Sequence, residues 1–256
     1  MEFRPCIDIH NGKVKQIVGG SLSDAAAQEN FVSERDAAFY AGLYKEKGLT
    51  GGHVILLNGR GTAEYEATKA QALTALRAYP GGLQLGGGIS PDNAAEFLEA
   101  GAAQLIVTSY VFREGRIDHE RLGEMLAAAG KEKLVLDLSC RRKEDGKCYI
   151  VTDRWQRFTE ESLSTELLEE LSDSAAEFLI HAVDVEGKQS GIDEGVLGIL
   201  ADYEGLPVTY AGGIRSMEDI ETIRRLGKGR VNFTVGSALD LFGGGLDFEE
   251  LCREYA

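Results

Sequence analysis

Short apolar runs rich in valine, isoleucine and leucine recur along the chain, and glycine or polar turn residues follow most of them. Apolar runs of this length between turn residues are typical of buried strands. We therefore predict eight strands, at residues 6–9, 53–57, 83–85, 105–108, 134–138, 178–183, 208–211 and 231–235.

The segments between these runs place apolar residues at helical spacing. In SPDNAAEFLEAG, Ser90 stands where a helix N-cap is expected, Pro91 at the first helical position and Gly101 just past the end. SMEDIETIRRLG repeats this plan from Ser216 to Gly227. Helical patterns also cover residues 64–78, 118–129, 160–171 and 193–202. Because strands alternate with helices, we expect parallel strand pairing.

The chain repeats itself in two halves. QLGGGIS (84–90) is similar to TYAGGIRS (209–216), LIVTSYVF (105–112) to NFTVGSALD (232–240), and CIDI (6–9) to VLDL (135–138). Three partner pairs, Asp8 with Asp137, Gly87 with Gly212 and Thr108 with Gly236, lie 129, 125 and 128 positions apart. The even spacing leaves no room for a linker. We therefore predict a single domain over residues 1–256, a (β/α)8 TIM barrel built from two repeated half-barrels.

The composition narrows the classes of partner. The formal net charge of −15 argues against a nucleic-acid partner, because phosphate backbones are bound by basic surfaces. No apolar run approaches the roughly 18 residues of a membrane span, so we expect no membrane contact. Four scattered cysteines without CxxC spacing, and no secretory apolar segment, favour a cytoplasmic protein. The four histidines are isolated from one another, so we expect no metal site.

Two acids stand at the ends of expected strands. Asp8 ends the first strand and Asp137 the fifth, and these strands face each other across a barrel whose active site lies at the strands' C-terminal ends. Two carboxyl groups over one pocket suit proton transfer, with one as general base and the other kept protonated by burial as general acid. The alternative is a pair of unrelated, half-exposed acids. The matched positions in the repeat favour catalysis.

Glycine turns follow two expected strands and precede a capped helix in each half. Such turns let backbone N–H groups converge on an anion at a helix N-terminus, although glycine also permits tight packing. Hydroxyl and further N–H groups lie beside each turn, at the ends of the fourth and eighth strands. We predict two phosphate sites and an elongated bisphosphate substrate, bound by Gly87, Gly88, Thr108 and Ser109 in one half and Gly212, Gly213, Gly236 and Ser237 in the other.

Aromatic and polar residues follow the fifth and sixth strands. Trp155, the only tryptophan, is expected to stack on a planar ring of the substrate, the alternative being a loop anchor on the rim. His181 and Asp184 are three residues apart, so a regular strand would point them to opposite faces. We favour Asp184 as the pocket-facing residue because it lies nearer the glycine that ends the strand, with His181 deeper and bonded to a backbone carbonyl.

Five stretches together resemble the histidine-biosynthesis isomerase family, in its fungal and plant version: PCIDIHNGKVKQIVGG, QLGGGIS, LVLDLSCRR, AGGIRS and VGSALDLFGG. The resemblance implies the half-barrel duplication and a substrate with two phosphates and an aminoimidazole ring. It implies a cofactor-free Amadori rearrangement, from the ProFAR aminoaldose to the PRFAR aminoketose. It also implies Asp8 as the base at C2, Asp137 as the acid at the furanose ring oxygen, and Trp155 over the substrate.

The chain departs from the commoner bacterial pattern at Gln16, where an Arg is usual, and at Asn58, where an acid is usual. In HAVDVEGKQSG, the family's Thr position could fall on His181, Ala182 or Asp184. A related cyclase of the next pathway step shares both acids but carries a Lys at the position of Gln16, so we place it second. A non-catalytic bisphosphate-binding barrel is the third reading. We expect a monomer whose partner is the small-molecule substrate.

Overall fold

The computed structural model describes residues 1–18, 29–188 and 190–256. In this part of the chain, eight parallel strands are neighbours in one curled sheet. Their bounds are β1 Cys6–His10, β4 Gly52–Leu56, β5 Leu83–Gly86, β6 Gln104–Val107, β9 Leu134–Asp137, β13 Glu177–His181, β14 Val208–Ala211 and β15 Asn232–Thr234. Each of the eight predicted apolar runs is therefore confirmed as a strand.

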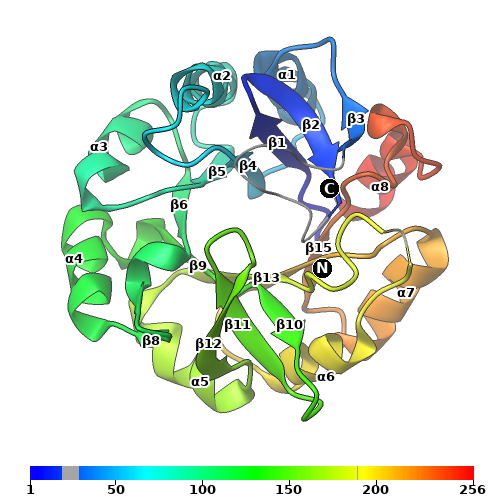
Figure 1. Ribbon diagram of the computed structural model, residues 1–256. Coiled ribbons are helices and arrows are strands. Elements are labelled where there is room, and N and C mark those ends of the chain that lie inside the picture. The colour runs from blue at the N-terminus through cyan, green and yellow to red at the C-terminus, as the bar shows by residue number, and fades with distance from the viewer. Residues whose placement is uncertain (19–28, 189) are drawn as a thin grey trace.

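The sheet closes on itself through the residues that precede β1. Phe3 forms a parallel bridge with Phe233 of β15. The Arg4 amide donates to the Phe233 carbonyl at 2.9 Å, and the Phe233 amide donates to the Glu2 carbonyl at 3.1 Å. Figure 1 looks into the barrel and shows the helices arranged around the outside of the strands. The predicted TIM barrel is confirmed.

One helix follows each barrel strand: α1 Ala37–Glu46, α2 Tyr65–Ala78, α3 Pro91–Glu99, α4 His119–Ala129, α5 Thr165–Leu171, α6 Glu194–Asp202, α7 Met217–Leu226 and α8 Phe248–Tyr255. The predicted caps are confirmed. The Ser216 hydroxyl accepts from the Asp219 amide at 3.3 Å, and the Ser90 amide donates to the Asn93 side chain at 2.9 Å. These caps fix where α3 and α7 begin, and therefore where the glycine turns before them end.

Two groups of buried apolar residues build most of the core of the described residues, and a third, Ile17 with Leu57, also packs against Ile55. The larger fills the space between the strands and the helices. The smaller lies inside the barrel and consists of Ile106, Val135, Leu179 and Ala211, with Ile55 packed against them. Deeper in the barrel, Glu177 pairs with Arg4 and accepts from Gln84 at 2.9 Å and Thr209 at 2.7 Å. The interior is thus filled below the C-terminal ends of the strands, as in other barrels of this size.

Additional strands stand above the barrel mouth. β2 (Lys13–Ile17) and β3 (Glu29–Val32) extend the sheet from β1 in antiparallel pairing. After β9, a three-stranded sheet forms from β10 (Cys140–Arg142), β11 (Cys148–Thr152) and β12 (Arg157–Ser162). A short pair, β7 (Phe112–Arg113) and β8 (Arg116–Ile117), precedes α4. Gly19 and Gly20, the last residues of the first family motif, lie outside the described residues.

The predicted helix at 160–171 is wrong in its first turn. Residues up to Ser162 belong to β12, where Ser162 pairs with Tyr149 of β11, and the Thr159 hydroxyl donates to the Ile150 carbonyl at 2.9 Å. The helix begins only after Ser164, whose hydroxyl accepts from the Leu167 amide at 3.2 Å. Strand pairing with a non-local partner overrides the local helical pattern here.

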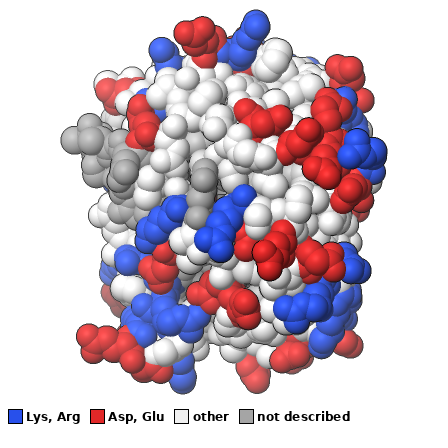
Figure 2. Space-filling view, turned by 90° about the vertical axis from the view of Figure 1, so that its right-hand side faces the viewer, with Lys and Arg blue, Asp and Glu red and all other residues white. Residues whose placement is uncertain are grey.

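The surface carries both signs of charge. On the face shown in Figure 2, Lys and Arg side chains are intermixed with Asp and Glu, and the formal net charge of the chain is −15. No helix in the described residues is long and apolar enough to cross a membrane.

Candidate active site

Two cavities open at the C-terminal ends of the barrel strands. The larger, about 360 Å3, is lined by the predicted residues of the first half, Gly87, Gly88, Thr108 and Ser109, and by Asp137 and Trp155. The smaller, about 30 Å3, is lined by the predicted residues of the second half, Gly212, Gly213, Gly236 and Ser237. Both cavities are lined by Asp8, His181 and Glu186. The two cavities therefore form one elongated site with a glycine turn towards each end.

Asp137, the last residue of β9, is surrounded by hydrogen-bond donors. Its Oδ1 accepts from the Ser139 amide at 2.9 Å and the Ser139 hydroxyl at 2.6 Å. Its Oδ2 accepts from the Thr108 hydroxyl at 3.2 Å, and His181 Nδ1 lies 3.6 Å from Oδ1. Burial favours the neutral acid, but His181 and Ser139 outweigh it and hold the pKa of Asp137 below its usual value.

Asp8, in the middle of β1, has a different environment. Among the described residues, its carboxyl receives one long contact, from Gln16 Nε2 at 3.5 Å. Burial and the nearby carboxylate of Glu186 raise its pKa to about 7, and the positive charge of His181 offsets only part of this. The two acids of the repeat are therefore unequal. Asp137 is ionised at neutral pH, whereas Asp8 exchanges its proton near neutrality.

His181, and not Asp184, faces the site. β13 ends at His181, and the imidazole lines both cavities. Asp184 lies beyond the strand, where its carboxylate accepts from Arg141 Nε at 3.0 Å and from the Arg142 amide at 2.8 Å. The preference for Asp184 is therefore corrected. Ala182 still bridges to Cys140, but the chain turns from Val183 onwards, so strand alternation no longer sets the direction of Asp184, which meets β10 instead.

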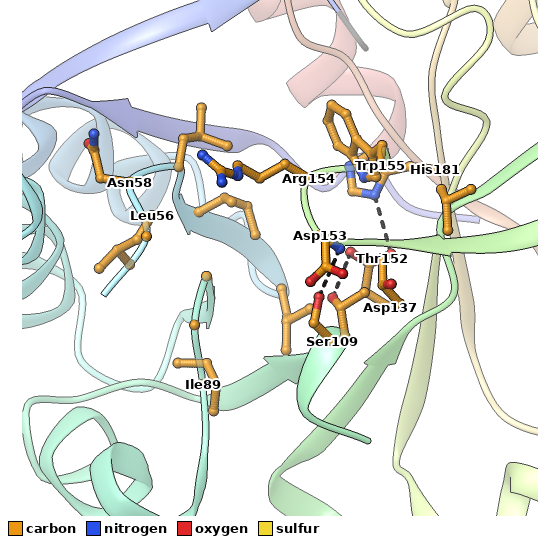
Figure 3. Close-up of a pocket in the computed structure, with 18 of the residues that line it drawn as sticks. Leu56, Asn58, Ile89, Ser109, Asp137, Thr152, Asp153, Arg154, Trp155 and His181 are labelled. Atoms are coloured by element: carbon orange, nitrogen blue, oxygen red, sulfur yellow. Dashed lines mark hydrogen bonds and ion pairs between the residues drawn. The ribbon is translucent and has the colours of Figure 1, made fainter. Parts of the chain in front are cut away.

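Trp155 lies at the turn between β11 and β12 and reaches into the site from above. Its indole Nε1 donates to the Ser139 hydroxyl at 3.1 Å, and its ring centroid is 5.7 Å from that of His181. Figure 3 shows the two rings side by side near Asp137. The same turn touches the first-half site, because the Asp153 amide donates to the Ser109 hydroxyl at 3.1 Å. The β11–β12 turn thus covers part of the mouth.

The glycine turns also have a packing reason. Gly87 has a φ of +103°, and a Cβ there would lie 2.2 Å from the Leu56 carbonyl oxygen. Gly213 has a φ of +77°, and a Cβ there would lie 2.1 Å from the Gly191 carbonyl oxygen. Larger residues are excluded at both positions by strain and by the backbone carbonyls of Leu56 and Gly191. Tight packing is therefore enough to explain the glycines at these two positions. That the turns also bind an anion remains a proposal, which rests on the two glycines lining the cavities.

Sequence reasoning missed Glu186. This residue lines both cavities, and its own pKa is raised by burial. It lies two residues beyond Asp184 and directly before Gly187, a glycine with a φ of +66°. An acid directly before a glycine that follows a barrel strand is the sequence feature that could have identified Glu186 as a site residue. In the described residues, no group of three or more His, Cys, Asp or Glu side chains is arranged to hold a metal ion.

Known proteins resemble this chain along nearly its whole length. The family described as "Histidine biosynthesis protein" matches residues 2–244. The chain is 54% identical to a chloroplastic protein of Medicago truncatula, over 98% of this chain and 80% of that protein. It is 48% identical to a Neurospora crassa protein (99% and 97%) and 42% identical to a Saccharomyces cerevisiae protein (98% and 97%). All three are named 1-(5-phosphoribosyl)-5-((5-phosphoribosylamino)methylideneamino)imidazole-4-carboxamide isomerase.

Proposed function

The chain belongs to the histidine biosynthesis protein family, and on that premise we propose that it is an isomerase that converts the ProFAR aminoaldose into the PRFAR aminoketose. One observation carries this proposal. Asp8 and Asp137, at matched positions of the repeat, line one elongated site that has a glycine turn towards each end. Such a site suits a substrate with a phosphate at each end and its reactive sugar carbons in the middle.

Asp8 serves as the general base. A base is most effective when its pKa lies near the working pH, and burial with Glu186 brings the pKa of Asp8 to about 7. In the Amadori rearrangement, a base takes the C2 proton after the furanose ring has opened. The electron pair then shifts towards the iminium carbon, and the enolamine becomes the ketose. The rearrangement moves protons and electrons within one molecule, so we propose that no cofactor takes part.

The acid function lies with Asp137 and the imidazole beside it. Ring opening needs a proton at the furanose ring oxygen as the C1–O bond breaks. Asp137 and His181 Nδ1 are 3.6 Å apart at the part of the site where the two cavities meet. This pair stands across the barrel from Asp8, which suits transfer of two protons at different atoms of one sugar.

The ends of the site bind the phosphates. Backbone N–H groups of glycine turns and nearby hydroxyls, such as those of Ser109 and Ser237, suit phosphate oxygens. Trp155 offers an aromatic face for the aminoimidazole ring.

The four cysteines are free and buried, which suits a reducing compartment such as the cytoplasm. The Medicago relative, by contrast, is named as chloroplastic. We propose that the protein acts as a monomer.

The test compares turnover of the aminoaldose by wild type, Asp8→Asn and Asp137→Asn, with the surface variant Asp173→Asn as control. Asp173 is fully exposed. Each site variant is expected to lose on the order of 10²–10⁴ in kcat with its fold intact, the usual contribution of a general acid or base. The control is expected to match wild type. Retention of more than about a third of wild-type turnover, a loss far below that range, would remove the residue concerned from the proposed mechanism.

A further inference from the structure

Three acids converge on one imidazole at the centre of the site. His181 ends β13, faces Asp137 of β9, and shares the lining of both cavities with Asp8 of β1 and Glu186. Its side chain is only 10% exposed. His181 Nδ1 has no hydrogen-bond partner within 3.5 Å in the described residues, and the Asp137 carboxylate at 3.6 Å is the acceptor that faces it. A buried imidazole in this position is a proton-transfer group, and the Asp137–His181 pair proposed above does not by itself say which of its two members gives up the proton.

This inference rests on the proposed isomerase function. We propose that His181, held as an imidazolium by Asp137, is the group that protonates the furanose ring oxygen of the aminoaldose. Asp137 then acts as the positioning residue that keeps the imidazole charged and oriented. Asp8 remains the base.

The hydrogen bonds of Asp137 favour this assignment. A carboxylic acid that donates a proton needs one oxygen free of donors that hold its ionised form. In Asp137, Oδ1 accepts from both the amide and the hydroxyl of Ser139, and Oδ2 accepts from Thr108. Hydrogen bonds to the charged form stabilise it, and the pKa of Asp137 is accordingly lowered. At neutral pH Asp137 therefore carries no proton to give.

The charges around His181 favour its protonated form. Burial alone would lower the pKa of His181, but the carboxyl groups of Asp137, Glu186 and Asp8 outweigh it and raise the pKa to about 9. In the described part of the chain, His53 of β4 also faces it, with ring centroids 6.0 Å apart. Burial, with the charge of His181, lowers the pKa of His53 to about 3, so His53 is neutral at working pH. Trp155, which packs on the other side, has no titrating group.

The protons balance over one turnover. An imidazolium N–H bond of His181 breaks as an O–H bond forms at the ring oxygen, the C1–O bond breaks, and the amine nitrogen forms a double bond to C1. Asp8 takes the C2 proton and returns it to C1. The C2 hydroxyl then gives up its proton as the ketone forms, and this proton restores the imidazolium. Substrate and product are isomers, and no oxidant or reductant is needed.

The pH dependence of kcat/KM separates this assignment from one in which Asp137 itself is the acid. Wild type is expected to lose activity below pH 7, as Asp8 is protonated, and above pH 9, as His181 loses its proton. His181→Gln is expected to lose on the order of 10²–10⁴ in kcat and to lose the limb near pH 9. His119→Gln, at an imidazole 67% exposed on α4, is the matched control and is expected to keep both limbs. A His181→Gln enzyme that keeps the limb near pH 9, or more than about a third of wild-type turnover, overturns the proposal.

A titration that does not depend on activity gives a second test. The histidine carbons of wild type, labelled with 13C, are followed by NMR, and the His181 signal is assigned by its loss in His181→Gln. We expect this signal to titrate near pH 9 and to move to lower pH in Asp137→Asn, because the Asp137 carboxylate raises the pKa of His181. A signal already neutral at pH 8 in wild type would overturn the assignment while leaving the isomerase function standing. Failure of wild type to turn over the aminoaldose would overturn both.

Discussion

Replacing Asp8 by Asn is expected to stabilise the fold at neutral pH while removing most of the turnover. Burial, together with the carboxylate of Glu186, raises the pKa of Asp8 from 3.8 to about 7. Each unit of pKa shift corresponds to about 1.4 kcal/mol, so the ionised carboxyl costs the native state about 4 kcal/mol above pH 7. Asparagine has nearly the same shape and no charge, and it avoids this cost.

The sign of the effect follows from proton binding. Between pH 3.8 and about 7, the folded protein keeps the Asp8 proton that the unfolded chain has lost. The free energy of unfolding of wild type therefore falls as pH rises through this window, and the contribution of this residue becomes constant above it. The Asn variant lacks this decline. Its advantage over wild type should grow by about 2 kcal/mol between pH 5.5 and pH 8.

The assay is urea unfolding followed by far-UV circular dichroism at pH 5.5 and pH 8, for wild type, Asp8→Asn and the exposed control Asp173→Asn. The urea midpoint of the Asp8 variant should exceed that of wild type, and by more at pH 8. The control should follow wild type at both values. A variant no more stable than wild type at pH 8, or an advantage that does not grow with pH, would refute the view that Asp8 is a destabilised buried carboxyl.

Three further outcomes are expected. A crystal soaked in sulfate should show one anion near Ser109 and one near Ser237, and anions found only elsewhere on the barrel would remove the bisphosphate substrate from the account. Trp155→Ala should raise KM for the aminoaldose by roughly tenfold with a smaller change in kcat, because stacking of a base on an aromatic side chain contributes about 1–3 kcal/mol. An unchanged KM in steady-state kinetics would mean that Trp155 only anchors its loop on the rim. Asp184→Asn should stay within about threefold of wild-type kcat/KM. Its carboxylate accepts hydrogen bonds from the Arg141 side chain and the Arg142 amide, and the loss of such surface pairs has little effect. A larger loss with the fold intact would place Asp184 in the site.

The barrel could be predicted from the sequence because its signals are local and repeated. Each parallel strand is an apolar run of a few residues, and the capped helices after Ser90 and Ser216 mark where the glycine turns end. The internal duplication is enough to align Asp8 with Asp137, although β1 continues to His10 and Asp8 therefore does not end its strand as expected, whereas Asp137 does end β9. The structure confirms that both acids line one cavity.

The parts that sequence could not supply depend on contacts between distant residues. Nothing near Glu160 shows that β12 will pair with β11, so the helical pattern of that segment extends too far. The direction of Asp184 depends on where the strand ends: β13 stops at His181 and a turn begins at Val183, so strand alternation does not set which way Asp184 points. The inequality of the two acids arises from the burial of Asp8 beside Glu186 and from the placement of His181 beside Asp137, which only the fold creates.

The isomerase activity itself is tested by giving the purified wild-type protein the aminoaldose alone, without ammonia, glutamine or any cofactor, and following the formation of product by chromatography against authentic aminoketose. We expect each aldose consumed to appear as one ketose, up to the equilibrium of the two isomers. An aldose that stays unchanged, while the same protein consumes the ketose once ammonia is added, would contradict this expectation and identify the cyclase reaction instead.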